Sequence, residues 1–125
     1  MSALDDILVK MNEKGRFSVA VLASSEGLTV ATASSAEDTE VAAAMAAVLQ
    51  RVGKQVREPL GMAELEEMVL LARDRTRLIC RYFLVGSEEL ILAVMVEPNA
   101  YYRSATSWAM REIEAAWLKG TSHKP

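Results

Sequence analysis

The sequence predicts an α+β fold in which a five-stranded antiparallel sheet carries helices on its faces, in the order α-β-β-α-β-β-β-α. Two short apolar runs joined by a turn precede a long Ala-rich helical segment, and three more strand-like runs follow that segment. Apolar residues recur at helical spacing near both ends of the chain. A length of 125 residues suits one domain. We assign this domain to residues 1–119 and expect residues 120–125 to form a flexible tail.

The first helix is predicted over residues 3–14. Apolar residues recur at helical spacing after Ser2, Asp5 lies in the first turn, and Gly15 stands just past the end. A hairpin follows, with strands at 17–23 and 28–33 joined by a turn that ends in Gly27.

Ser34 and Glu37 have the spacing of a capping box, so the second helix is predicted from about residue 37 to residue 57. It carries two apolar stripes on adjacent faces. The larger side chains are Val41, Met45, Val48, Val52 and Val56, and the smaller set is Ala42, Ala46, Leu49 and Gly53. A helix on a sheet needs one stripe, and small residues let a second helix approach closely. We therefore expect the larger stripe on the sheet and the smaller one in a dimer interface.

Three strand-like runs at 68–72, 77–84 and 90–96 are separated by short turn segments, which predicts an antiparallel meander. The last helix is predicted over 101–119. The first of these strands lies at an edge of the sheet if the far end of the meander joins the first hairpin. An edge strand invites pairing with another chain, so the expected dimer interface also includes Met68, Val69, Leu70 and Leu71.

Composition narrows the class of partner and the location. A net charge of −3 and a pI near 5.2 argue against nucleic acid, because phosphate binding needs a concentrated basic surface. No apolar run approaches the ~20 residues that span a bilayer. The chain starts with acidic residues in place of an export signal. These features favour a cytoplasmic protein without direct membrane insertion.

The succession "VAVLASSEGLTVATAS", "EVAAAMAAVLQRVGKQV", "LEEMVLLARDRTRLICRYF" and "EELILAVMVEPNAY" resembles the Roadblock/dynein light-chain family over roughly residues 4–117. The resemblance implies a Roadblock-like (profilin-like) fold and a dimer whose sheet is continuous across two subunits. It implies no intrinsic catalysis. Prokaryotic members commonly bind Ras-like small GTPases and some stimulate GTP hydrolysis, whereas eukaryotic members serve as dynein light chains or scaffolds.

The sequence predicts no catalytic, cofactor or metal site. His123 is the sole histidine and lies near the end of the chain, where nothing orients it. Cys80 lies within a strand without a histidine partner, which favours an inert thiol. Three glutamates, Glu64, Glu66 and Glu67, favour a solvated charge run over a metal site.

Two sets of residues are candidate partner contacts. Arg73 and Arg75 lie at a hairpin, where an arginine could stabilise a phosphoryl group in a GTPase site, although charged hairpin tips commonly serve solubility. Tyr101 and Tyr102 begin the last helix, where aromatic residues serve either a partner or the core.

The leading hypothesis is a non-catalytic homodimer that binds a Ras-like small GTPase and modulates its nucleotide cycle. One alternative is a scaffold or dynein-light-chain-type adaptor without effect on GTP hydrolysis. Another is a small-ligand sensory module. A ligand pocket usually contains a few convergent polar groups, and the sequence shows no buried polar cluster that would form one.

Overall fold

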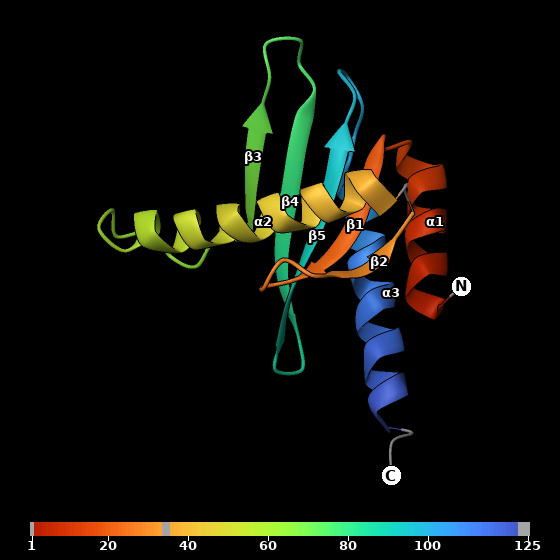
Figure 1. Cartoon of the computed structure of the whole chain (residues 1–125). Helices are drawn as coiled ribbons and strands as arrows, with labels where there is room; N and C mark the ends of the chain where they lie inside the picture. Colours follow the sequence, from red (N-terminus) through yellow and green to blue (C-terminus); the bar gives the residue numbers. More distant parts are fainter. Residues whose placement is uncertain (1, 34–35, 123–125) are drawn as a thin grey trace.

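The computed structural model describes residues 2–33 and 36–122, and its elements follow the predicted order (Figure 1). They are α1 (Ala3–Gly15), β1 (Val19–Ser24), β2 (Thr29–Thr32), α2 (Ala36–Arg57), β3 (Glu67–Leu71), β4 (Arg77–Val85), β5 (Glu88–Val96) and α3 (Arg103–Ser122). The α+β class is confirmed. Helix α3 continues to Ser122, beyond the predicted end at residue 119. Ser34 of the predicted capping box and His123 lie outside the described residues.

The five strands form one antiparallel sheet in the order β2-β1-β5-β4-β3. Strand β5 lies at the centre, where it pairs with β1 on one side and β4 on the other. Its residues Leu90–Val94 are all buried, which fits a strand covered on both faces. The meander therefore joins the first hairpin through β5, and the predicted edge position of β3 is confirmed.

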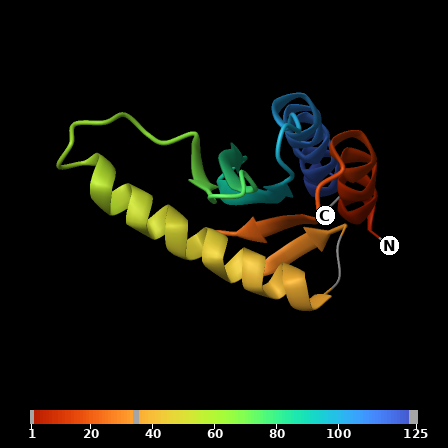
Figure 2. The same ribbon diagram turned by 90° about the horizontal axis from the view of Figure 1, so that it is seen from above.

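Helices cover both faces of the sheet, with α1 and α3 together on one face and α2 on the other (Figure 2). Alternate residues of β5 face opposite ways, so Leu92 and Val94 join the core beneath α1 and α3, whereas Ile91 and Ala93 join the core beneath α2. The core beneath α2 consists mostly of small side chains.

The face of α2 that contacts the sheet is the one that carries small side chains. Ala43, Ala46 and Ala47 are at most 2% exposed. A Cβ added at Gly53 would lie 2.8 Å from both Leu65 Cδ1 and Met68 Sδ. Small side chains let the helix axis approach the strands closely, as they would let it approach a second helix.

The sequence-based assignment of the two stripes was wrong. Ala46 and Gly53 are buried within their own chain, and Ala42 and Leu49 are half-buried against the core beneath α2. The stripe of larger residues faces outward instead. Both stripes are apolar and neighbour each other, so periodicity alone does not decide which one contacts the sheet.

Helix α2 is longer than the sheet is wide at this level. Its C-terminal turns project past β3, and residues 58–66 lead back to the start of that strand (Figures 1 and 2). Gly61 has a φ of +67° in this connection, and the Met62 amide donates to the Arg57 carbonyl at 2.9 Å. The projecting end of α2 thus lies beside the open edge of the sheet.

Candidate protein interface

The outward face of α2 is an unpartnered apolar surface in the single chain. The side chains of its valine stripe, defined as Val41, Met45, Val48, Val52 and Val56, are 38–64% exposed. Continuous exposed apolar surface of this kind marks interaction sites in soluble proteins.

Strand β3 presents an open edge next to this stripe. The Tyr82 amide donates to the Glu66 carbonyl, and the Ala72 amide donates to the Thr76 carbonyl, at 2.9 Å in each case. Because hydrogen-bonded positions alternate in an antiparallel pair, Glu67, Val69 and Leu71 direct their backbone groups away from β4. Val69, Leu70 and Leu71 are about half exposed. Of the four predicted interface residues on β3, Met68 is half-buried, and Val69, Leu70 and Leu71 lie at an accessible apolar edge.

The opposite edge of the sheet, at β2, is closed by a side chain. Ala33 donates to the Ala20 carbonyl, so by the same alternation Thr32 directs its amide outward. That amide donates to Asp5 Oδ1 of α1 at 3.0 Å. This hydrogen bond is the main cause that lowers the pKa of Asp5, and bonds from Ser2 add to it. Asp5 therefore occupies an edge position that a pairing strand would need.

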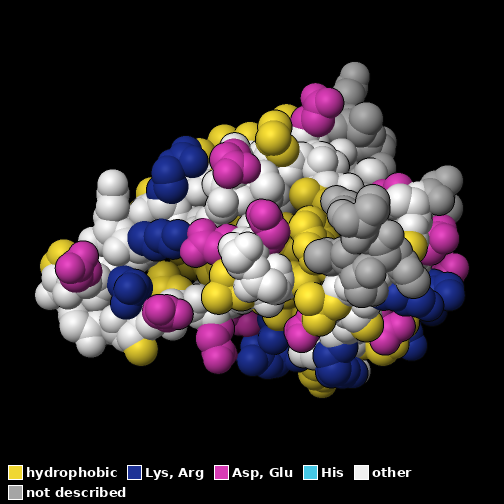
Figure 3. All heavy atoms as spheres, turned by 90° about the horizontal axis from the view of Figure 1, so that it is seen from below, with side chains coloured by type: hydrophobic (Ala, Val, Ile, Leu, Met, Phe, Trp, Pro, Cys, Tyr) yellow, Lys and Arg dark blue, Asp and Glu magenta, His cyan; other side chains and the backbone are white. Residues whose placement is uncertain are grey.

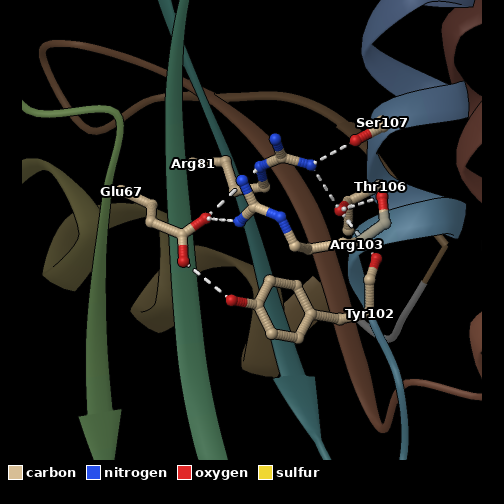
Figure 4. Close-up of polar contacts among 6 residues, drawn as sticks. All are labelled: Glu67, Arg81, Tyr102, Arg103, Thr106 and Ser107. Carbon is tan, nitrogen blue, oxygen red and sulfur yellow. Dashed lines mark hydrogen bonds and ion pairs between the residues drawn. The ribbon is translucent and has the colours of Figure 1, made fainter.

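A polar cluster joins the start of β3 to the start of α3 (Figure 4). Glu67 Oε1 accepts from Arg103 Nη1 at 2.8 Å and lies 3.6 Å from Arg81 Nε, while Oε2 accepts from the Tyr102 hydroxyl at 2.7 Å. Burial, followed by this hydrogen bond, raises the pKa of Tyr102. Glu67 thus fixes the first residue of the edge strand to two side chains of the α3 region.

Arg81 extends the cluster along α3. Its Nη1 donates to Thr106 Oγ1 and to Ser107 Oγ, both at 2.8 Å, and its side chain is only 12% exposed. A guanidinium held in this way is a structural cross-brace between β4 and α3.

The candidate partner contacts differ in accessibility. Arg73 and Arg75 are exposed in the β3–β4 hairpin, and Arg75 adopts a φ of +77°. Tyr101 is 91% exposed, whereas Tyr102 is half-buried and bonded to Glu67. Tyr101 and the two arginines remain available to a partner, and Tyr102 has a structural role.

The part of the chain that the structure describes offers neither a group of metal ligands nor a reactive thiol. No three His, Cys, Asp or Glu side chains there are grouped to hold a metal ion. Cys80 is buried, and burial raises the pKa of its thiol to about 11, which leaves little thiolate at neutral pH. Across residues 2–33 and 36–122, no helix has the length and apolar character to cross a membrane.

Sequence reasoning misses two features of this surface. It assigns Glu67 to a solvated charge run and treats Asp5 only as a residue of a helix start. Glu67 lies at a strand entry, with Arg81 directly opposite in the ladder. That opposition would have indicated the ion pair once the register was known. Nothing local indicates that Asp5 meets Thr32.

Comparison with known proteins agrees with this architecture. Residues 3–95 match the family model described as Roadblock/LC7 domain. Among solved structures, Myxococcus xanthus MglB has 15% identity and a TM-score of 0.79, with 95% of this chain and 98% of that chain covered. A Roadblock/LC7 domain from Streptomyces avermitilis has 20% identity and a TM-score of 0.78, covering 96% of this chain and 99% of that one.

The gliding protein MglB from Thermus thermophilus has 16% identity and a TM-score of 0.74, covering 92% of this chain and 91% of that chain. No curated protein matches the sequence. Identities this low establish a shared fold. The family match covers most of the chain and agrees with the observed element order. The chain therefore belongs to the Roadblock/LC7 domain family.

Proposed function

We propose that this chain is a non-catalytic regulator that forms a two-fold dimer through α2 and β3 and, as a dimer, binds a Ras-like small GTPase. The main observation in favour of a dimer is that β3 has an open apolar edge and that the valine stripe of α2 is exposed. Pairing two edges satisfies backbone groups that the single chain leaves to solvent, and packing two stripes buries apolar surface. A second copy fits both features because a two-fold axis presents the same patch on each side.

The contrast between the two edges supports this choice. The β2 edge has Asp5 on the amide of Thr32, whereas the outward-facing residues of β3 are Glu67, Val69 and Leu71, two of them apolar and exposed. Native sheets commonly protect edges that are not meant to pair. The β3 edge is therefore the better template for a second strand.

One antiparallel register pairs the whole strand with itself. A two-fold axis through Val69 sets Glu67 opposite the second copy's Leu71, so all three outward-facing residues take part. On the α2 side of the sheet, Met68 then lies opposite the second copy's Leu70. Both α2 helices lie on the same face of the joined sheet, where each valine stripe can contact the other helix.

A cysteine cross-link tests the dimer and its register. In Val69→Cys, two copies place their Cα atoms about 5.5 Å apart, within the range for a disulfide. Leu70→Cys is the matched control, because its counterpart lies diagonally at about 7–8 Å. Native Cys80 is buried and should not react. We expect a covalent dimer for Val69→Cys in mild oxidant; efficient cross-linking of Leu70→Cys alone would contradict the register.

The GTPase component rests on family membership and on the structural likeness to MglB from two organisms. The test is a pull-down with purified protein as bait, run in parallel with GDP and with a non-hydrolysable GTP analogue. We expect a small GTPase in the analogue lane, because a regulator recognises the ordered switch segments. The same partners in both lanes, without a GTPase, would favour the scaffold.

The matched bait is Val52→Asp with Val56→Asp, which places two charges on the valine stripe. We expect it to be monomeric and to lose the GTPase, since the proposed binding surface is built from both copies. Capture of the GTPase by a bait that is verifiably monomeric would contradict the dimer requirement.

A further inference from the structure

A groove of about 720 Å³ opens between the C-terminal half of α2 and the sheet. Small-molecule pockets commonly have volumes of about 300–1,000 Å³. In the view from below, acidic and basic side chains surround apolar atoms over this end of the molecule (Figure 3). One chain supplies the lining, from α2, from the segment that leads into β3, and from β4 and β5; it includes Gln50, Lys54, Glu66, Tyr82 and Leu84.

Strand β4 provides the floor of the groove. Tyr82 packs against the core beneath α2, so alternation places Leu84 on the same face of the sheet. The Tyr82 amide donates to the Glu66 carbonyl, and Leu84 lies opposite Glu89 in the ladder. Directly opposed residues on one face have Cβ atoms about 4.5–5.5 Å apart. A glutamate therefore lies beside each of these two β4 side chains.

Two buried polar groups line the groove without a partner in the protein. Gln50 is only 7% exposed, and its side-chain amide forms no hydrogen bond with a residue that the structure describes. The hydroxyl oxygen of Tyr82 is buried and has no hydrogen-bond partner within residues 2–33 and 36–122. Native proteins satisfy most buried polar groups. Both groups are therefore available to an occupant of the groove.

The two groups select a carbonyl or an amide. Burial raises the pKa of Tyr82, so its hydroxyl keeps the proton at neutral pH and can donate to a carbonyl oxygen. The carboxamide of Gln50 both donates and accepts, as an amide partner requires.

The charges that line the groove favour a cation. Lys54 Nζ pairs with Glu89 at 3.1 Å, and Arg57 Nη1 donates to the Met62 carbonyl at 3.3 Å. Three further glutamates form no ion pair with a described residue: Glu58, Glu64 and Glu66. After the Lys54–Glu89 pair, one guanidinium faces three carboxylates. A cleft with an excess of one charge attracts ligands of the opposite charge.

We propose that this groove binds a small organic cation that carries a carbonyl or amide group on an apolar body. Glu64 and Glu66 attract the cationic end, Tyr82 donates to the carbonyl oxygen, and Leu84 contacts the apolar part. The site does not depend on the proposed dimer or on a GTPase, because one chain supplies the whole lining.

A matched pair of probes tests the charge preference in the full chain. Nα-benzoyl-L-argininamide has a guanidinium, two carbonyls and an aromatic ring. Nα-benzoyl-L-citrullinamide has nearly the same shape without the charge. By isothermal titration calorimetry, we expect the arginine probe to bind about tenfold more tightly than its neutral twin, and high salt to narrow the difference.

Tyr82→Phe tests the hydrogen bond, because it removes the hydroxyl and keeps the ring. We expect the affinity for the arginine probe to fall about fivefold. Denaturation should show that the variant is at least as stable as the original, because the lost hydroxyl had no partner in the fold. A hydroxyl with a purely structural role would give the opposite pattern, with lower stability and unchanged affinity.

Glu64→Gln with Glu66→Gln tests the carboxylates. We expect about tenfold weaker binding of the arginine probe and unchanged binding of the neutral twin. The control is Glu13→Gln with Glu112→Gln, which removes the same charge at exposed positions on α1 and α3. Absence of binding, equal affinity for the two probes, or equal effects of the two glutamate pairs would overturn the proposal.

Val52→Asp with Val56→Asp separates this site from the proposed function. We expect this variant to bind the arginine probe as the original does, although it should be monomeric and lose the GTPase. Loss of the probe from the folded variant would show that one chain does not form the site. Failure of the dimer or of GTPase capture leaves the probe results unchanged.

Discussion

Asp5 on the first turn of α1 accepts a hydrogen bond at 3.0 Å from the backbone amide of Thr32, a residue 27 positions later on the edge strand β2. The same carboxylate accepts from Ser2 through its other oxygen. The Asp5 side chain therefore completes the capping box of α1 and also binds an outward-facing amide of the edge strand β2.

Asp5→Ala removes both contacts. We expect a loss of about 1–2 kcal/mol in the free energy of unfolding, because a charged acceptor is lost from two backbone amides. The freed edge should also increase light scattering at high protein concentration. Urea denaturation and static light scattering measure these effects. Asp6→Ala is the control, since Asp6 lies in the same turn; equal effects of the two variants would remove the special role of Asp5.

Acid should weaken the same contact. The folded-state pKa of Asp5 is lowered, mainly by the Thr32 amide. Its contribution is therefore complete above the unfolded-state pKa of about 3.9 and is lost as pH falls through the lower folded-state pKa. Thermal melts of the original chain and of Asp5→Asn should differ at neutral pH and converge in acid. A difference that persists at the lowest pH would refute the charge-dependent contribution.

Glu67→Gln should destabilise the chain by roughly 2 kcal/mol, because it removes the carboxylate that faces Arg81 and Arg103. Arg81 is only 12% exposed, so its guanidinium would lose its nearby countercharge in a poorly solvated place. Chemical denaturation measures the change. Glu88→Gln, at an exposed position, should stay within about 0.5 kcal/mol of the original. Similar values for both variants would show that the cluster contributes little.

Ala46→Leu should cost about 1–3 kcal/mol, because Ala46 is fully buried where α2 lies on the sheet. Val48→Leu adds volume on the outward face and should be nearly neutral for folding of the single chain. The comparison is best made by denaturation in the background of Val52→Asp with Val56→Asp, which we expect to be monomeric. The reverse order of sensitivity would mean that the two faces of α2 had been assigned incorrectly.

Local sequence patterns predict much of this fold. The turn that ends in Gly27 separated the first two strands, and the short turn segments between the last three strand-like runs predicted a meander. The order of elements and the edge position of β3 followed. These features depend on residues close together in the chain, where spacing reports structure directly.

The contacts of the candidate interface were harder to foresee because they join distant residues. Glu67 meets Arg103 across 36 positions, and this requires the β3–β4 register and the docking of α3 together. The orientation of α2 depends on how closely the helix lies on the sheet, and this close packing favours Ala46 over the larger Val48 at the contact. A single sequence shows neither the position of α3 relative to β3 nor the spacing between α2 and the sheet.

The place of β5 in the sheet has a consequence for synthesis of the chain. The middle strand is the last of the five to leave the ribosome, and Val19 must wait for Met95 before it can pair. Until then the nascent chain holds two hairpins with no strand between them, and α2 has only part of the surface on which it rests. Contacts this distant in sequence form slowly. A chain halted before Glu88 would carry four of the five strands and still lack a continuous sheet.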